Sequence, residues 1–127
     1  MIVVHTGQHD SDSSASLFRE LHLAEPDVHL GVGIAAPGQQ LAQMIAGMGP
    51  VLSRVGPDLV VVHGDTTSTL AGALAANRRQ IPIVHIEAGL RSYDRRMPEE
   101  HNRVMVDHLA DLLFAPTDIQ GDILRRE

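Results

Sequence analysis

The chain has 127 residues and carries 10 Lys and Arg against 16 Asp and Glu, which gives a formal charge of −6 with His neutral. This length fits one domain or part of one. The acidic balance, without any Lys/Arg-rich stretch, argues against nucleic acid as a partner, and the absence of Cys excludes disulfides, thiolate zinc sites and cysteine nucleophiles. No apolar run approaches the ~20 residues of a membrane span, and the N-terminus lacks the basic and apolar regions of a signal peptide. We therefore expect a cytoplasmic protein without a membrane partner.

Five short apolar runs, rich in β-branched residues and bounded by Gly, Pro or Asp, predict buried strands. They cover residues 1–6, 28–32, 58–63, 81–87 and 112–115. Segments of helical period lie between them, over residues 13–24, 39–55, 66–77 and 98–110. Gly49-Pro50 inside the second segment predicts a kink and not a boundary. This alternation indicates an α/β fold, a Rossmann-like parallel sheet with flanking helices on both faces.

Ligands of open α/β sheets bind at the carboxyl ends of the strands, so these ends are the first place to look for a site. The strand over residues 58–63 runs into Gly64-Asp65-Thr66. Its two-residue period sends His63 and Asp65 to the same side, and the amides of residues 66–68 open a helix whose N-terminus attracts anions. The alternative is that Asp65 or Thr66 only caps this helix.

The next two segments supply further carboxylates. The strand over residues 81–87 ends in Glu87, which is costly to bury without a partner, and a salt bridge to Arg91 or Arg95 is the structural alternative to a catalytic role. Glu99 and Arg103 stand four residues apart at a helix start and share a face, where they form either part of a site or a surface ion pair. The neighbouring Glu100 is expected to be solvated, so that Glu100→Gln is nearly silent.

Eight histidines raise the question of a metal. A metal-dependent hydrolase built on His63, Asp65, His85 and Glu87 is one alternative function. The pairs His63/Asp65 and His85/Glu87 are not accompanied by a His-x-x-x-His helix or by a third cluster of metal-ligating residues. We therefore expect no bound metal. A non-catalytic interaction module is a further alternative.

Several motifs, in their order and spacing, closely resemble the non-hydrolysing UDP-N-acetylglucosamine 2-epimerases. These motifs are Thr6-Gly7-Gln8-His9, His63-Gly64-Asp65-Thr66-Thr67, His85-Ile86-Glu87-Ala88-Gly89-Leu90-Arg91, Pro98-Glu99-Glu100-x-Asn102-Arg103 and Phe114-Ala115-Pro116-Thr117. The resemblance implies the N-terminal half of a two-domain fold of the glycosyltransferase-B type. Residues 1–127 would be a partial N-terminal Rossmann-like domain, with the second domain absent and the first strand missing from the middle of the sheet, between residues 1–6 and 58–63.

The resemblance also implies the activity, the interconversion of UDP-GlcNAc and UDP-ManNAc by elimination and re-addition of UDP, without a cofactor. It makes Asp65, Glu87 and Glu99 the catalytic carboxylates, supported by Arg103. Substrate contacts are then expected from four residues that flank them, which are His63, Thr66, His85 and Arg91. Gln8 and Gln39 would retain part of a second, regulatory UDP-GlcNAc site.

A UDP-sugar substrate and a homodimer are the partners that follow from the resemblance, and the isolated chain is expected to be inactive. Two alternatives lie inside the same family. One is an epimerase of a related UDP-sugar, such as a 2,3-diacetamido uronic acid, and the other is a hydrolysing relative that releases ManNAc.

Overall fold

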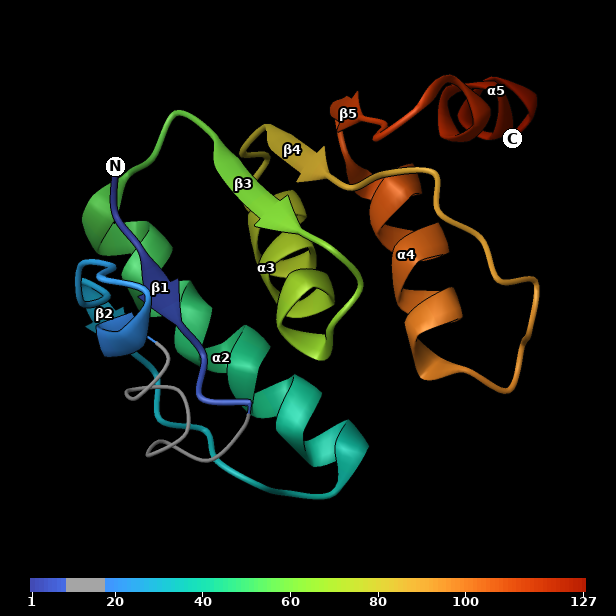
Figure 1. Cartoon of the computed structure of the whole chain (residues 1–127). Helices are drawn as coiled ribbons and strands as arrows, with labels where there is room; N and C mark the ends of the chain where they lie inside the picture. The colour runs from blue at the N-terminus through green and yellow to red at the C-terminus, as the bar shows by residue number, and fades with distance from the viewer. Residues whose placement is uncertain (9–17) are drawn as a thin grey trace.

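The computed structural model describes residues 1–8 and 18–127 (Figure 1). Its strands are β1 (Val4–His5), β2 (Val28–His29), β3 (Val60–His63), β4 (Ile83–Ile86) and β5 (Leu112–Phe114). Its helices are α2 (Pro37–Val55), α3 (Thr67–Asn77), α4 (Pro98–Leu109) and α5 (Asp118–Arg126). Each of the five predicted strands is present, and the helices predicted over residues 39–55, 66–77 and 98–110 are confirmed. Of the helix predicted over residues 13–24, residues 13–17 lie outside the described residues; residues 18–20 are helical and a turn follows at residues 21–22, so the described part ends earlier than predicted.

The strands form two parallel sheets, β1-β2 and β3-β4-β5, which confirms the α/β class. In the larger sheet His63 pairs with Ile86, so β3 and β4 end at the same level. The strands of the smaller sheet are shorter than predicted, and the segment predicted to continue β2 contains Gly31, whose φ of 62° lies outside the extended region. α2 continues through Pro50, as expected for a kink within one helix. Within the described residues, none of the helices combines the length and apolar character that a membrane crossing requires.

A cavity of about 630 Å³ separates β1 from β3. Val4 and Val60 pack against the same buried residues of α2 and α3, so the two strands lie over one helical layer, and Figure 1 shows them running in the same direction. Leu30 N–H donates to the His5 carbonyl, and Val60 N–H donates to the Pro82 carbonyl. Because alternate residues of a strand bond to alternate sides, Val4 and Val61 turn their backbone groups away from β2 and β4. Among the described residues, no strand pairs with this side of either sheet, so each sheet has a free edge there.

Helices α3 and α4 cover one face of the larger sheet. Ile83 and Val62 are buried there against Val106 and the alanines of α3, which are small enough to let the helix approach the sheet closely. The opposite face leaves Val61 and Phe114 more than half exposed, at 55% and 54%. The expectation of helices on both faces is therefore not met in the part of the chain that the structure describes.

Candidate active site

The Asp65 carboxylate lies in the turn between β3 and α3. Gly64 has φ 73°, a left-handed conformation that lets the chain turn directly after the strand. Arg103 of α4 forms an ion pair with Asp65 Oδ2 through its Nη2, and the Asn102 side chain donates to the Asp65 carbonyl at 2.8 Å. The Asp65 side chain is 30% exposed, so its carboxylate is fixed by α4 and still open to a ligand.

Thr66 caps α3, as the structural alternative had it. Its hydroxyl oxygen accepts from Thr69 N–H at 3.3 Å. The side-chain oxygen of Gln8 accepts from the Ser68 N–H at 3.0 Å and from the Ser68 hydroxyl at 2.9 Å. The predicted anion site at this helix start is thus largely filled by the chain's own oxygen atoms.

Gln8 and Gln39 are expected to retain part of a regulatory site, but the residue that contacts Gln8 is Gln40. Gln40 donates from its side-chain nitrogen to the backbone carbonyls of Gln8, at 3.0 Å, and Gly33, at 2.7 Å. Gln39 is exposed. The structure therefore ties Gln8 into the fold on two sides and does not join it to Gln39.

Glu87 follows β4 immediately and has φ 74°, an uncommon value for a residue with a side chain. Its backbone N–H donates to the Phe114 carbonyl at 3.1 Å, which holds the turn against β5. The carboxylate Oε2 lies 3.2 Å from His63 Nε2, and both side chains are open to solvent, at 42% and 70%. The described residues show no salt bridge from Glu87 to Arg91 or Arg95, the structural alternative, and Arg91 is bound to Asp107 and Glu127.

Helix α4 presents one polar face to the strand ends. Glu100, Arg103 and Asp107 follow the i, i+3, i+7 spacing of one helical face, and all three are turned inward. Arg103 joins Glu100 Oε2 at 3.0 Å in addition to Asp65. No ion pair links Glu99 to Arg103 in the described residues, and Glu99 is exposed. Of the three predicted catalytic carboxylates, the structure thus holds Asp65 and Glu87 in defined contacts and leaves Glu99 free at the start of the helix.

The expectation that Glu100 is solvated is wrong, since only 5% of the residue is exposed. Its carboxylate accepts from the Ser92 N–H at 2.8 Å, the Ser92 hydroxyl at 2.9 Å and the Tyr93 N–H at 3.0 Å. Burial alone would raise the pKa of Glu100, but these donors and the charge of Arg103 outweigh it and hold the pKa below its usual value. Glu100 therefore anchors the loop in which Tyr93 adopts φ 58°.

His85 is expected from the sequence to contact the substrate, but its ring is completely buried. Nδ1 lies 2.6 Å from Asp107 Oδ1 and Nε2 lies 2.8 Å from the Gly64 carbonyl oxygen. Burial lowers the pKa of His85, whereas the hydrogen bonds to Asp107 and Gly64 and the charge of Asp107 raise it, and the net pKa is above its usual value. Both ring nitrogens are occupied by protein, so the ring has no free nitrogen for a ligand.

Arg91, a second expected substrate contact, is also buried, with 1% of its side chain exposed. It pairs with Asp107 Oδ2 at 2.8 Å and with Glu127 Oε1 at 3.0 Å. Asp107 Oδ2 also accepts from the Gly89 N–H at 3.1 Å. Burial would raise the pKa of Asp107, but His85, Arg91 and this amide together lower it. The network joins β4, the loop after it, α4 and the end of α5.

Two parts of this arrangement were missed from the sequence. Asp107 carried a signal, because it shares a helical face with Arg103. Helix α5 also carried one, with Thr117 at its N-cap and Asp118 in its first turn. The contact between Arg91 and Glu127 could not be predicted from a local sequence pattern, because the two residues are 36 positions apart in the chain.

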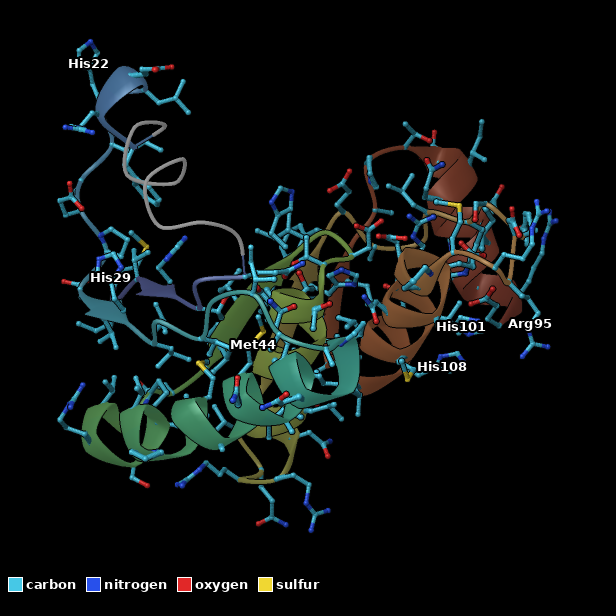
Figure 2. All side chains as sticks on the ribbon, turned by 90° about the horizontal axis from the view of Figure 1, so that it is seen from below. His22, His29, Met44, Arg95, His101 and His108 are labelled. Atoms are coloured by element: carbon cyan, nitrogen blue, oxygen red, sulfur yellow. The ribbon has the colours of Figure 1, made fainter. Side chains whose placement is uncertain are left out.

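The described residues contain no group of three or more His, Asp and Glu side chains arranged to hold a metal ion. The hydrolase alternative needed His63, Asp65, His85 and Glu87 together. Figure 2 shows the labelled histidines spread over the molecule, with His22 and His29 at the opposite end from His101 and His108. The geometry therefore offers carboxylates and cations for acid–base chemistry and no metal centre among these groups.

Comparison with known proteins points in one direction. A family model described as UDP-N-acetylglucosamine 2-epimerase matches residues 1–127. A UDP-N-acetylglucosamine 2-epimerase of Methanocaldococcus jannaschii is 47% identical over 126 residues, which are 98% of this chain and 34% of that protein. The UDP-2,3-diacetamido-2,3-dideoxy-D-glucuronate 2-epimerase of Pseudomonas aeruginosa is 46% identical over 127 residues, which are 99% of this chain and 36% of that one.

Solved structures agree with these matches. A crystal structure of the Methanocaldococcus jannaschii UDP-GlcNAc 2-epimerase in complex with UDP-GlcNAc and UDP has a TM-score of 0.93 at 47% identity, and the match covers 97% of this chain and 34% of that one. The Neisseria meningitidis UDP-GlcNAc 2-epimerase bound to UDP-GlcNAc has a TM-score of 0.89 at 34% identity, with 95% and 33% of the two chains covered. The chain thus spans about a third of the length of these relatives.

Proposed function

The chain belongs to the UDP-N-acetylglucosamine 2-epimerase family, and we propose that the protein containing it is a non-hydrolysing isomerase that interconverts UDP-GlcNAc and UDP-ManNAc. The observation that carries this proposal is the placement of two carboxylates at one edge of the sheet. Because His63 pairs with Ile86, Asp65 and Glu87 both lie within two residues of the ends of adjacent strands. Each has a cationic or titratable partner, Arg103 for Asp65 and His63 for Glu87.

The chemistry needs one group to remove a proton from C2 of the sugar and another to return it on the opposite face. As the C2–H bond breaks, its electrons form the C1–C2 double bond and the C1–O bond breaks, so that UDP leaves with the bonding pair. Addition of the UDP oxygen to C1, with protonation of C2 from the other side, gives the epimer. We assign these two proton transfers to the carboxylates among Asp65, Glu87 and Glu99.

The departing diphosphate needs cations, and the arginines closest to the carboxylates are already paired. Arg91 binds Asp107 and Glu127, and Arg103 binds Asp65 and Glu100. We therefore infer that the groups that hold UDP come from outside residues 1–127. The same inference applies to the sheet: residues 1–127 are proposed to be part of a first Rossmann-like domain, in which a further strand fills the cavity between β1 and β3.

A related substrate is the second candidate. The identity to the Pseudomonas aeruginosa enzyme, whose name gives a 2,3-diacetamido uronic acid as the sugar, is 46%, against 47% for the UDP-N-acetylglucosamine 2-epimerase. Incubation of the complete enzyme with each UDP-sugar, followed by separation of products, distinguishes the candidates. A UDP-linked epimer supports the isomerase, whereas free ManNAc and UDP would identify a hydrolysing enzyme.

We expect the complete enzyme to be a cytoplasmic homodimer. Light scattering tests its oligomeric state, and cell fractionation tests its location.

The catalytic assignment is tested in an epimerase that contains this segment. Asp65→Asn and Glu87→Gln should each lower kcat by about 10²–10⁴, the range of an acid–base group, and slow deuterium incorporation at C2 from heavy water to a similar extent. Asp122→Asn is the matched control, because Asp122 forms an exposed ion pair with Arg125 within α5 and, in the part of the chain that the structure describes, contacts none of the candidate carboxylates. If Glu87→Gln kept near-normal kcat, Glu87 would lose its catalytic assignment.

A further inference from the structure

His85 connects the two strand ends that carry the candidate carboxylates. It lies in β4, two residues before Glu87, and its Nε2 reaches the carbonyl oxygen of Gly64, the residue before Asp65. Nothing but protein touches the ring, which is completely buried. A residue with this placement acts on the site only through other residues.

The two contacts define the protonation state of the ring. A carbonyl oxygen only accepts, so Nε2 must carry a proton to bond with Gly64. Asp107 also binds Arg91 and the Gly89 amide, so it is an ionised acceptor and Nδ1 must carry a proton as well. The two contacts together therefore fit a ring that carries a proton on both nitrogens.

The surrounding charges balance this cation. Asp107 faces it from α4 and attracts it, whereas Arg91 from the loop after β4 repels it. Glu127 at the end of α5 neutralises Arg91 in turn. The cluster thus contains two positive and two negative side chains, so its charges balance. In this state the Nε2–H of His85 donates to the Gly64 carbonyl.

We propose that His85 is a positioning residue that fixes the Gly64 carbonyl and thereby directs the Asp65 carboxylate toward the reacting sugar. Two successive carbonyls of the turn are held, that of Gly64 by His85 and that of Asp65 by Asn102. Because Gly64 has φ 73° and no side chain, its conformation depends on backbone contacts, and the His85 bond to its carbonyl adds to the bond of 3.0 Å that its N–H makes with the Ile86 carbonyl. This role rests on the proposed function, since it matters for the rate only if Asp65 takes part in the reaction.

Two conservative variants separate positioning from a purely structural role. The Gln side-chain nitrogen reaches the place of Nε2, so His85→Gln keeps a donor for Gly64 and loses the contact with Asp107. The Asn nitrogen reaches the place of Nδ1, so His85→Asn keeps the contact with Asp107 and loses the donor for Gly64. In an epimerase containing residues 1–127, we expect His85→Asn to lower kcat about 100-fold with little change in KM, and His85→Gln to stay within about tenfold of the parent. His101→Gln is the control, because His101 also meets a backbone carbonyl, that of Arg95, but on the surface.

A readout without catalysis keeps this proposal separate from the proposed function. In the 127-residue chain, NMR should show both ring N–H groups of His85 at pH 7, and hydrogen exchange at the amides of Asp65 and Thr66 should quicken in His85→Asn more than in His85→Gln. Equal exchange and equal loss of kcat in the two variants would overturn the positioning role. A ring without a proton on Nε2 in the unsubstituted chain would overturn it even if His85→Asn did not fold. Normal NMR and exchange results with a silent Asp65→Asn would instead refute the catalytic assignment of Asp65.

Discussion

Replacement of Glu100 by Gln tests whether this buried carboxylate holds the loop before α4. The neighbouring Glu99 provides a control of the same type, one position away and exposed. Glu100 Oε1 accepts from the Tyr93 N–H, whereas Oε2 accepts from the Ser92 N–H and hydroxyl and from Arg103. An amide has only one oxygen, so its NH₂ group must face at least one N–H donor.

The expected cost follows from these contacts. A hydrogen bond to a charged group contributes about 1.5–3 kcal/mol, and a buried donor left without an acceptor costs about 1–3 kcal/mol. If the amide oxygen takes the place of Oε2, the Tyr93 bond is lost and the ion pair with Arg103 becomes a neutral contact. We expect a loss of about 3 kcal/mol, which is a large part of the roughly 5–15 kcal/mol that stabilises a typical domain. For a chain of this size that corresponds to a fall in Tm of roughly 12 °C.

Urea denaturation of the purified chain, followed by circular dichroism, measures this difference. Glu99→Gln should change the free energy of unfolding by less than about 0.5 kcal/mol, as is usual for an exposed side chain. In the complete enzyme the order should reverse for catalysis, with Glu99→Gln lowering kcat at unchanged stability. Equal stability of the two variants would refute the structural role of Glu100.

Four further outcomes are expected. Folding raises the pKa of His85 and lowers that of Asp107. The stability that His85 contributes is therefore complete below pH 6.5 and is lost as the pH rises through the pKa of the folded state. The stability that Asp107 contributes is complete above pH 3.8 and is lost as the pH falls through the pKa of the folded state. Urea denaturation across pH should therefore show both contributions in full between these values, and an unfolding free energy that rises steadily above pH 8 would contradict this. Gly89→Ala should lower the free energy of unfolding, measured by thermal denaturation, by at least about 2 kcal/mol, because φ is 81° and a Cβ would lie 2.6 Å from the Gln120 carbonyl oxygen. Gly31→Ala should lower it less, because Gly31 has φ 62° but no heavy atom within 4 Å of an added Cβ. Glu87→Gly should unfold at the same or a higher temperature while activity is lost, because glycine removes the strain of φ 74°; a clear loss of stability would show that the side chain is structurally required. Val61→Lys should reduce aggregation seen by light scattering, because Val61 is exposed on the strand with a free edge, and unchanged aggregation would exclude this edge as the contact.

Helix α4 shows how far sequence reasoning reached and where it went wrong. Proline at its first position and two following glutamates predicted where it begins, because these residues suit the start of a helix. Glu99 and Glu100 differ by about 100° around the helix axis, so only one of them points toward the strand ends. The spacing of four residues to Arg103 favoured Glu99 as the inward residue. The spacing of Glu100, Arg103 and Asp107, at i, i+3 and i+7, places all three on one face of the helix and would have identified Glu100 as an inward residue.

The sequence by itself determined the parallel α/β fold and the positions of Asp65 and Glu87 at strand ends. These follow from local patterns, since apolar runs and helical periods act over a few residues and the strand ends follow from them. Only the tertiary structure decided which polar residues are buried. Arg91 and His85 stand in motifs that are typical of ligand contacts, yet Asp107 of α4 binds both of them and Glu127, at the end of α5, binds Arg91. A charge can be buried only where partners from distant segments converge on it, and that convergence is a property of the packed elements and not of any local stretch.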